Sequence, residues 1–441
     1  MKNGCHEARY CIIGAGYSGL GVAKAFRDAG IPFDCFEKND AIGGNWYDGV
    51  YDSTHIISSR DTTGYGDFPM PRSYPDFPSR KQVLDYLNAY ADRFDLHRSI
   101  QLRTEVSHME PVDPKGMEGW RLRLADGTEH HYSGVVVANG HHWAKRIPSY
   151  PGHFSCKTLH SKDYKNPSDF AGKRVLVVGA GNSGCDIAVE AAKTMGEAHI
   201  SMRRGYYFLP KTIMGIPTAE MDHPWVPFFV QKGIIRLAIW ISVGSNERYG
   251  LQKPDHKLFE HHPIVNSQLL YFIRHGSIQP HRDIARLDGQ TVHFVDGTSI
   301  DVDTIVWATG FHVSFPFLDH ALFEWENGIP KRLAGMLAPN LAGLYVFGLL
   351  QPRGGAGPLI SAGAQFLADI VSAQECLDVP IADELSRFMK PDANMLVGVH
   401  STLRQIRFGR RLVRWIAKRG SKRTGRSKTS QSSQHPSLTK P

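Results

Sequence analysis

Gly14-Ala15-Gly16-Tyr17-Ser18-Gly19 follows directly after the apolar run Tyr10-Cys11-Ile12-Ile13, and residues 20–29 continue with helical spacing. Strand, glycine loop and helix in this order are typical of a dinucleotide-binding unit. Its first glycine permits a tight turn, its second lets backbone N–H groups approach a pyrophosphate, and its third lets the helix pack on the strand. The helix N-terminus then faces the phosphate charge. We predict that the three glycines of this loop bind a dinucleotide.

The next expected strand, residues 33–36, ends in Glu37, which lies 18 residues after Gly19. A carboxylate at about this distance accepts hydrogen bonds from ribose hydroxyls and disfavours a 2′-phosphate. We therefore expect this half to bind an adenosine with a free 2′-OH, as in FAD or NAD.

A second unit begins at residues 174–178 and continues with Gly179-Ala180-Gly181-Asn182-Ser183-Gly184. Its following strand, residues 198–202, ends in Arg203-Arg204 instead of an acid. Guanidinium groups pair with a 2′-phosphate in forked geometry, so these arginines favour NADPH. The alternative is that they are ordinary solvated charges.

A hairpin pattern also occurs twice. Asp126-Gly127 and Asp296-Gly297 each separate two alternating runs, which predicts a tight turn, and buried runs follow at residues 135–140 and 305–310. Each hairpin is expected to close one nucleotide-binding half. The predicted fold is α/β of three-layer ββα type, with two Rossmann-like dinucleotide-binding domains. The expected divisions are residues 1–168 (FAD domain, first part), 169–300 (inserted NADPH domain, with a helical insertion at about 211–280), 301–395 (FAD domain, second part) and 396–441 (basic helix and disordered tail).

Composition limits the other possibilities. Twelve of the 51 Lys and Arg residues lie from Arg404 onward, and the remaining 39 face 43 acidic residues, so the basic charge belongs to the tail. The body therefore offers no reason to expect nucleic-acid binding. The six cysteines form no C-x-x-C, which argues against a zinc ribbon or a redox dithiol, and no metal site is expected. Scattered cysteines fit a reducing cytoplasm.

Five further segments resemble the flavin-containing monooxygenases, the class B flavoprotein monooxygenases, in the order in which that family has them. They are Gly43-Gly44-Asn45-Trp46, Asp67–Pro71, Tyr74–Pro78, Val306–Phe311 and Gly348–Pro352. The family fingerprint between the two loops is present as Phe154, His160 and Tyr164, with Cys156 in place of glycine. The resemblance covers about residues 10–371. Tyr164 separates the chain from typical Baeyer–Villiger enzymes, which have Trp there.

The resemblance implies FAD and NADPH as cofactors and O2 and a small molecule as substrates. In the family, reduced flavin forms a C4a-(hydro)peroxyflavin that oxygenates a soft nucleophile, an amine nitrogen or a sulfide sulfur. Two alternatives remain open: Baeyer–Villiger oxygenation of a ketone, and an uncoupled NADPH oxidase that produces hydrogen peroxide.

The matching segments also suggest individual site residues. We expect Arg60, Asp61 and Gln351 to be catalytic and Gly44, Asn45, Trp46, Thr309 and Gly310 to contact a cofactor; the alternative for the polar ones is that they are exposed loop residues. Ile57 occupies a position where many family members have Asn near the reactive carbon of the flavin. An apolar residue there keeps the oxidase alternative open.

Two regions carry no motif. Residues 224–230 and 234–243 are strongly apolar but are interrupted by Gln231, Lys232 and Arg236, so no membrane span is predicted. Helices that cover the NADPH domain are favoured there over a substrate-entry wall or a membrane-facing lip. Residues 403–418 predict a basic amphipathic helix that either contacts an anionic membrane peripherally or packs on the body. The oligomeric state stays unassigned.

Overall fold

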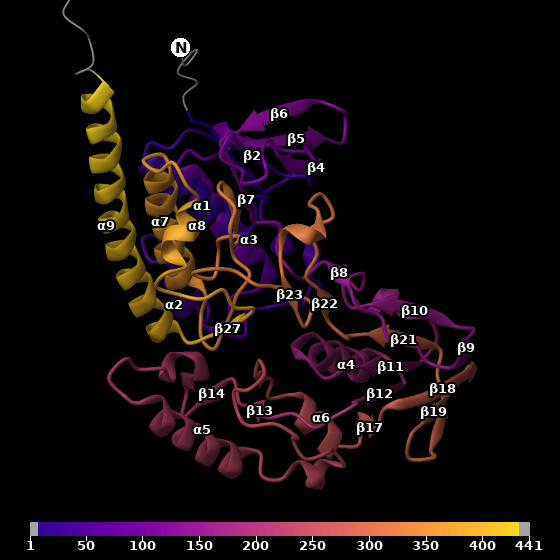
Figure 1. The fold of residues 1–441 in the computed structure, drawn as a ribbon. Helices are drawn as coiled ribbons and strands as arrows, with labels where there is room; N and C mark the ends of the chain where they lie inside the picture. Colours follow the sequence, from indigo (N-terminus) through magenta and orange to yellow (C-terminus); the bar gives the residue numbers. More distant parts are fainter. Residues whose placement is uncertain (1–7, 432–441) are drawn as a thin grey trace, which may run out of the picture.

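The computed structural model describes residues 8–431, with side chains through Arg419. Two five-stranded parallel sheets organise it (Figure 1). The first sheet has the order β25-β7-β1-β2-β3, and the second has the order β10-β21-β11-β12-β17. The bounds of the first are Leu344–Val346, Gly134–Val137, Tyr10–Ile13, Phe33–Phe36 and Ile100–Gln101; those of the second are Lys157–His160, Thr304–Trp307, Arg174–Val178, Glu197–Ser201 and Gln279–His281.

Alternate side chains of β1 belong to two different cores. Tyr10 and Ile12 pack with helices α1 (Tyr17–Asp28), α3 (Arg80–Arg93) and α7 (Gly357–Gln374). Cys11 and Ile13 pack on the opposite face, against the small antiparallel sheet β4-β5-β6. That sheet has the bounds Val106–Pro111, Trp120–Leu124 and Glu129–Tyr132. Because neighbouring residues of a strand point to opposite faces, this arrangement builds three layers.

The second domain repeats the arrangement. Helices α4 (Asn182–Thr194) and α6 (Leu269–Arg274) cover one face of its sheet. The antiparallel strands β18 (Ile284–Gly289), β19 (Thr291–Phe294) and β20 (Ser299–Asp301), with β9 (Gly152–Phe154) beside β18, cover the other. The predicted pair of Rossmann-like domains and the two predicted hairpins are therefore confirmed.

Strand pairing changes the expected division of the chain. β10 was expected in the first part of the FAD domain and β21 in its second part, but both belong to the second sheet, where β21 lies between β10 and β11. The boundaries at 168/169 and 300/301 therefore do not separate the two sheets. The chain enters the second sheet before residue 157 and leaves it after residue 307. Local pattern could not assign these strands, because sheet membership depends on pairing with distant segments.

Residues 205–278 form the insertion. It contains short strand pairs, β13 (Phe208–Leu209) with β16 (Ile264–Val265) and β14 (Thr212–Ile213) with β15 (Ile216–Pro217), and the helix α5 (Phe228–Ser242). Phe228–Tyr249 is the one stretch among the described residues that would suffice, by length and composition alone, to cross a membrane. The 15 residues of α5, however, extend only about 22 Å, which is less than the roughly 30 Å of bilayer hydrocarbon.

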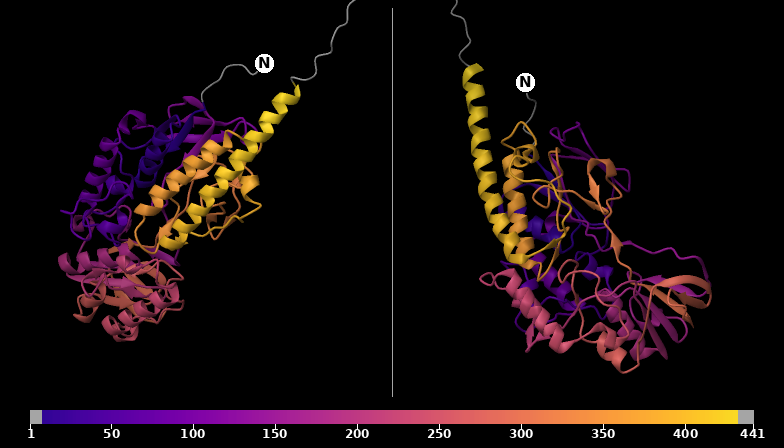
Figure 2. Two further views of the ribbon diagram at one scale, coloured as in Figure 1. Left: turned by 90° about the vertical axis from the view of Figure 1, so that its left-hand side faces the viewer. Right: turned by 60° about the horizontal axis from the view of Figure 1, so that its bottom comes forward.

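The C-terminal helix α9 spans Val399–Gln431 and lies along α7 (Figures 1 and 2). Its residues Ile406, Val413 and Ile416 are buried in the core that α7 shares. Of the two alternatives for this helix, the structure shows packing on the body for these three residues, whereas Phe408 and Trp415 stay exposed. The helix continues through residues 422–431, which were expected to be disordered, whereas residues 432–441 lie outside the described part of the chain.

Candidate active site

The first glycine loop has backbone geometry that excludes larger residues. Gly14 has φ of +104°, and a Cβ atom there would come within 2.7 Å of the Ala138 carbonyl oxygen. A Cβ atom at Gly19 would lie 1.8 Å from the Gly14 carbonyl oxygen. Gly16 faces Gly44, whose backbone comes within 3.5 Å of where a Cβ of Gly16 would be. The loop and the Gly43–Trp46 segment therefore meet, as the resemblance implied.

Glu37 lies beside this loop. Its carboxylate accepts hydrogen bonds from the backbone N–H groups of Ala15 at 2.8 Å and Asn39 at 3.0 Å, and the residue is buried. The predicted acid is therefore fixed against the phosphate-binding loop, at the end of β2 where a ribose would lie.

The second loop has the same tight geometry as the first at its first and last glycines. Gly179 has φ of +102°, and a Cβ atom at Gly184 would lie 1.9 Å from the Gly179 carbonyl oxygen. Gly181 faces open space, with no atom within 4 Å of an added Cβ. Asn182 and Ser183 form the first turn of α4, and the Asn182 side chain accepts a hydrogen bond from the Val265 N–H at 2.9 Å. The exposed face of Gly181 leaves room for a phosphate group.

The two predicted arginines follow the end of β12. Arg203 is exposed. The guanidinium of Arg204 lies 5.4 Å from the ring centre of Tyr206 and 3.3 Å from the His261 ring nitrogen, and its Nε has no hydrogen-bond partner among the described residues. Both arginines thus follow the second strand of this unit, at the position that the sequence predicted.

Thr309 and Gly310 follow β21 and lie where the chain leaves the second domain. The Thr309 hydroxyl donates to the Arg146 carbonyl, and Nε2 of His160 lies 3.0 Å from the Gly310 carbonyl oxygen. His160 Nδ1 accepts the Lys162 N–H, so the proton is on Nε2. Burial lowers the pKa of His160, which keeps the ring neutral. The fingerprint residue His160 therefore links the end of β10, where the chain enters the second sheet, to the segment that follows β21, where the chain leaves it. This is a structural role. Ala308 contacts Gly179, so this segment borders the second glycine loop.

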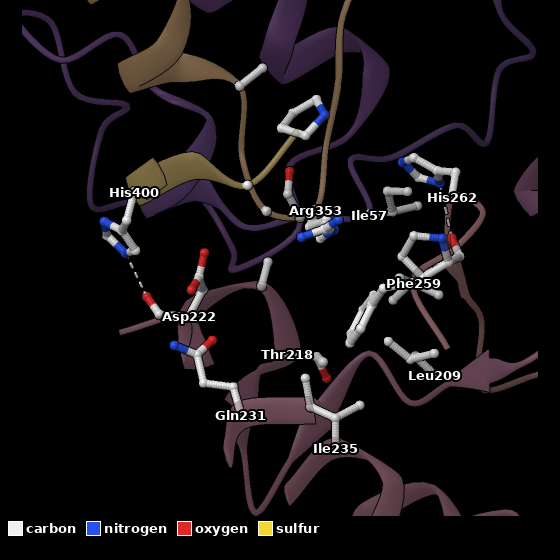
Figure 3. A pocket seen from close by; sticks show the side chains of 18 of the residues that line it. Ile57, Leu209, Thr218, Asp222, Gln231, Ile235, Phe259, His262, Arg353 and His400 are labelled. Carbon is white, nitrogen blue, oxygen red and sulfur yellow. Dashed lines mark hydrogen bonds between the residues drawn. The ribbon is translucent and has the colours of Figure 1, made fainter. Parts of the chain in front are cut away.

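A cavity of about 800 Å³ opens between the two domains. Its walls come from residues 46–63, 209–265, 352–356 and 398–404, together with His142. Figure 3 shows Ile57, Phe259, Leu209 and Arg353 converging on it. The insertion therefore forms a wall of the cavity. The favoured expectation, that these helices only cover the NADPH domain, was incomplete, because segments 224–228 and 259–265 contribute residues to the cavity wall.

The residues predicted to be catalytic do not line this cavity. Arg60 bonds to the Asp61 carboxylate at 2.8 Å and to the carbonyl oxygens of Tyr74 at 2.6 Å and Arg72 at 3.3 Å, and Asp61 is largely exposed. Arg60 thereby attaches residues 72–74 to α2 (Arg60–Thr63). This arrangement favours the alternative interpretation, that Arg60 and Asp61 are loop residues without a catalytic role.

Other predicted residues lie at the margin of the cavity. Gln351 stands one residue before the wall residue Pro352, and its own strand β26 (Gln351–Pro352) pairs with β27 (Leu396–Val397). Trp46 lines the wall, whereas Asn45 packs against Gly49 in the turn behind it. Ile57, the position that differs from the Asn of many relatives, is itself a wall residue.

Several wall residues carry charge or polarity that the motifs did not reveal: Asp222, Arg353, His400 and Arg404. Nε2 of His400 lies 2.8 Å from the Asp222 carbonyl oxygen. Burial lowers the pKa of Arg353. The only signal in the sequence was that Arg353 directly follows the recognised Gly348–Pro352 segment. Asp222, His400 and Arg404 come from the insertion and from α9, which only the folded chain brings together.

The family model for flavin-binding monooxygenase-like proteins matches residues 7–387. Dimethylaniline monooxygenase [N-oxide-forming] 2 of Oryctolagus cuniculus is 32% identical over 386 residues, which cover 81% of this chain and 72% of the relative. Probable indole-3-pyruvate monooxygenase YUCCA9 of Arabidopsis thaliana is 31% identical over 367 residues, 80% of this chain and 86% of the relative.

Solved structures share the fold. An open crystal structure of cyclohexanone monooxygenase superposes with a TM-score of 0.70 at 19% identity, covering 94% of this chain and 98% of that one. A flavin-containing monooxygenase from Stenotrophomonas maltophilia gives 0.63 at 22% identity, covering 83% and 98%. The two glycine loops, each too tight for a Cβ atom at its first and last glycine, fit the FAD and NADPH that this family uses. The chain belongs to the flavin-binding monooxygenase-like family of oxidoreductases.

Proposed function

We propose that this protein uses FAD, NADPH and O2 to oxygenate the amine nitrogen or sulfide sulfur of a small organic substrate. The observation that carries the proposal is the cavity between the domains. It joins segments that border the FAD half, Trp46 and residues 55–63, to the insertion of the NADPH half. A substrate held there is within reach of both nucleotide-binding halves.

The cofactor roles follow from position. Gly14, Gly16 and Gly19 are placed to hold the FAD pyrophosphate, with Glu37 on its ribose. Gly179, Gly181 and Gly184, with Asn182 and Ser183, are placed to hold that of NADPH, and Arg203 and Arg204 to pair with its 2′-phosphate. When bound, these cofactors supply the hydride and the activation of oxygen. The chain's own residues orient the substrate and exclude water.

The walls suit a substrate that reacts through its own lone pair. Ile57, Leu209, Phe228, Ile235 and Phe259 are apolar, and an amine or sulfide among them is stripped of water. Burial lowers the pKa of the wall residue His262, so its ring is neutral at pH 7. Oxygen transfer to nitrogen or sulfur asks for no protein nucleophile. The rabbit relative's name, an N-oxide-forming dimethylaniline monooxygenase, supports the same class.

The test compares three substrate classes with one preparation of holoenzyme. Methyl phenyl sulfide, N,N-dimethylaniline and cyclohexanone are each incubated with NADPH and air, and products are identified by mass spectrometry while NADPH loss and hydrogen peroxide are measured. We expect sulfoxide or N-oxide in proportion to the NADPH consumed. Lactone as the dominant product would support the Baeyer–Villiger alternative, and hydrogen peroxide equal to NADPH consumed with all three would support the oxidase alternative.

A further inference from the structure

Arg353 is a cation in the cavity wall that has no ion-pair partner among the residues that the structure describes. It follows β26, and its backbone N–H donates to the Val397 carbonyl at 3.0 Å, which fixes the start of its side chain. The residue is half-buried, and its Nε has no hydrogen-bond partner within the described part of the chain. No carboxylate of the described residues lies within ion-pair distance of its guanidinium. The one close contact is with the ring of Phe228, whose centre is 4.7 Å away.

The surroundings of Arg353 compensate its charge only in part, because the charge of Asp222 raises its pKa but the two side chains do not form an ion pair. Asp222 is the single acidic side chain among the described residues that line the cavity, and Arg404 adds a second cation. Burial lowers the pKa of Arg353, but a guanidinium remains charged in proteins. A half-buried charge without a close counter-ion is costly, so a ligand that brings an anion to this point gains the energy of partly desolvated pairing. Figure 3 shows the side chain at the centre of the cavity, near Ile57 and Phe259.

The loops expected to hold the cofactor phosphates lie away from Arg353. The NADPH pyrophosphate loop, residues 179–184, and the arginines at 203 and 204 are not part of the cavity wall, and neither is the FAD loop. The phosphate groups of both cofactors are therefore expected at other places. The remaining candidate for an anionic partner of Arg353 is the substrate.

We propose that Arg353 binds a carboxylate of the substrate, so that the enzyme prefers organic acids that carry an amine or sulfide on an apolar body. A carboxylate matches the planar guanidinium with two parallel hydrogen bonds. The apolar body would lie against Phe228, Ile235 and Phe259, which line the same cavity. This inference rests on the proposed function and assigns its substrate class.

The experiment uses one matched pair of probes, 4-(methylthio)benzoate and its methyl ester, which differ in charge but share the sulfide. Sulfoxide formation is measured for the wild-type holoenzyme and for R353M, R353K and R236M. Arg236 is an exposed cation of α5 that does not line the cavity and serves as the control. Flavin content and thermal midpoint are recorded for each variant.

We expect the wild type and R236M to favour the acid over the ester in kcat/KM by about tenfold or more. R353M should lose this preference mainly through a higher KM for the acid, and R353K should keep part of it because a point charge remains. An equal fall in kcat/KM for the acid and for the ester in R353M would overturn the proposal. A changed Kd for NADP+ in R353M with an unchanged preference for the acid would also overturn it.

A second measurement separates this inference from the proposed function. The oxidised holoenzyme is titrated with 4-(methylthio)benzoate and with the ester, and tryptophan fluorescence reports binding, since Trp46 and Trp225 line the cavity. Binding of the acid that weakens at least tenfold in R353M supports the carboxylate site even if no sulfoxide forms. Absence of acid binding to the wild type would refute the site, whatever the enzyme oxygenates.

Discussion

At the scale of single residues, the glycine loops show how local backbone geometry specifies a binding site. Gly19 and Gly184 sit at equivalent places, and in each case an added Cβ atom would collide with the carbonyl oxygen of the loop's first glycine. Gly181 faces open space instead. The spacing of glycines therefore encodes two different requirements, close packing of helix on strand and access for a phosphate.

Gly19→Ala should abolish FAD binding, because a Cβ atom 1.8 Å from the Gly14 carbonyl oxygen forces the loop open. Gly181→Ala should leave flavin content and thermal midpoint unchanged and raise the KM for NADPH, because the methyl group occupies only the phosphate's space. Absorbance of the purified proteins and steady-state kinetics measure both effects. Normal flavin content in Gly19→Ala would contradict the geometry described for the loop.

Arg203 and Arg204 should determine the choice of nicotinamide cofactor. Replacing both by Gln removes the partners of a 2′-phosphate, and charge-assisted hydrogen bonds contribute about 1.5–3 kcal/mol each. We expect kcat/KM for NADPH to fall by at least about tenfold, with kcat/KM for NADH nearly unchanged. An equal fall in kcat/KM with NADPH and with NADH would mean that the two arginines support the fold and do not bind the 2′-phosphate.

At the scale of elements, the packing of α9 on α7 depends on Gly409. A Cβ atom at this glycine would lie 2.6 Å from the ring of Phe366, a buried residue of α7. A glycine generally weakens a helix interior, but here it allows α9 and α7 to approach closely.

Gly409→Ala is expected to lower the free energy of unfolding by about 1–2 kcal/mol, because overpacking costs about 1–3 kcal/mol and outweighs the helix propensity of Ala. Gly233→Ala in α5 is the matched control. Nothing lies within 4 Å of its added Cβ, so it should stabilise by about 0.5–1 kcal/mol. Urea unfolding measures both, and a stabilised Gly409→Ala would show that α9 does not pack as described.

α5 presents its apolar side chains outward. Trp225, just before the helix, is 92% exposed and Trp240 is 71% exposed. Since α9 buries Ile406, Val413 and Ile416 against the body, we expect membrane contact chiefly through α5. We expect the protein to sediment with phosphatidylcholine vesicles. The double substitution Trp225→Ser with Trp240→Ser should reduce the sedimented fraction several-fold. Trp415→Ser on α9 should leave that fraction unchanged. If the protein does not bind vesicles but forms a dimer that the α5 substitutions dissociate, then the exposed face of α5 binds a second copy of this chain.

At the scale of the whole molecule, local signals were enough to predict two nucleotide-binding halves, because each loop, its helix and its acid or arginines lie within about thirty residues. The membership of β10 and β21 in the second sheet depends on pairing between segments more than a hundred residues apart. The cavity is assembled from four distant segments and His142. For this reason His400 carried no readable signal, and Arg353 carried only its place after a recognised segment. Motif positions alone also gave Arg60 and Asp61 a catalytic role that their contacts with each other do not favour.

The central claim is that one oxygen atom of O2 is transferred to a substrate bound between the two domains. The most direct measurement is turnover of methyl phenyl sulfide or 4-(methylthio)benzoate with NADPH under 18O2, with mass spectrometry of the product and a parallel determination of NADPH consumed. We predict one 18O atom in each sulfoxide molecule and nearly one sulfoxide per NADPH. Unlabelled product, or complete recovery of the reducing equivalents as hydrogen peroxide with neither sulfide oxygenated, would contradict the account.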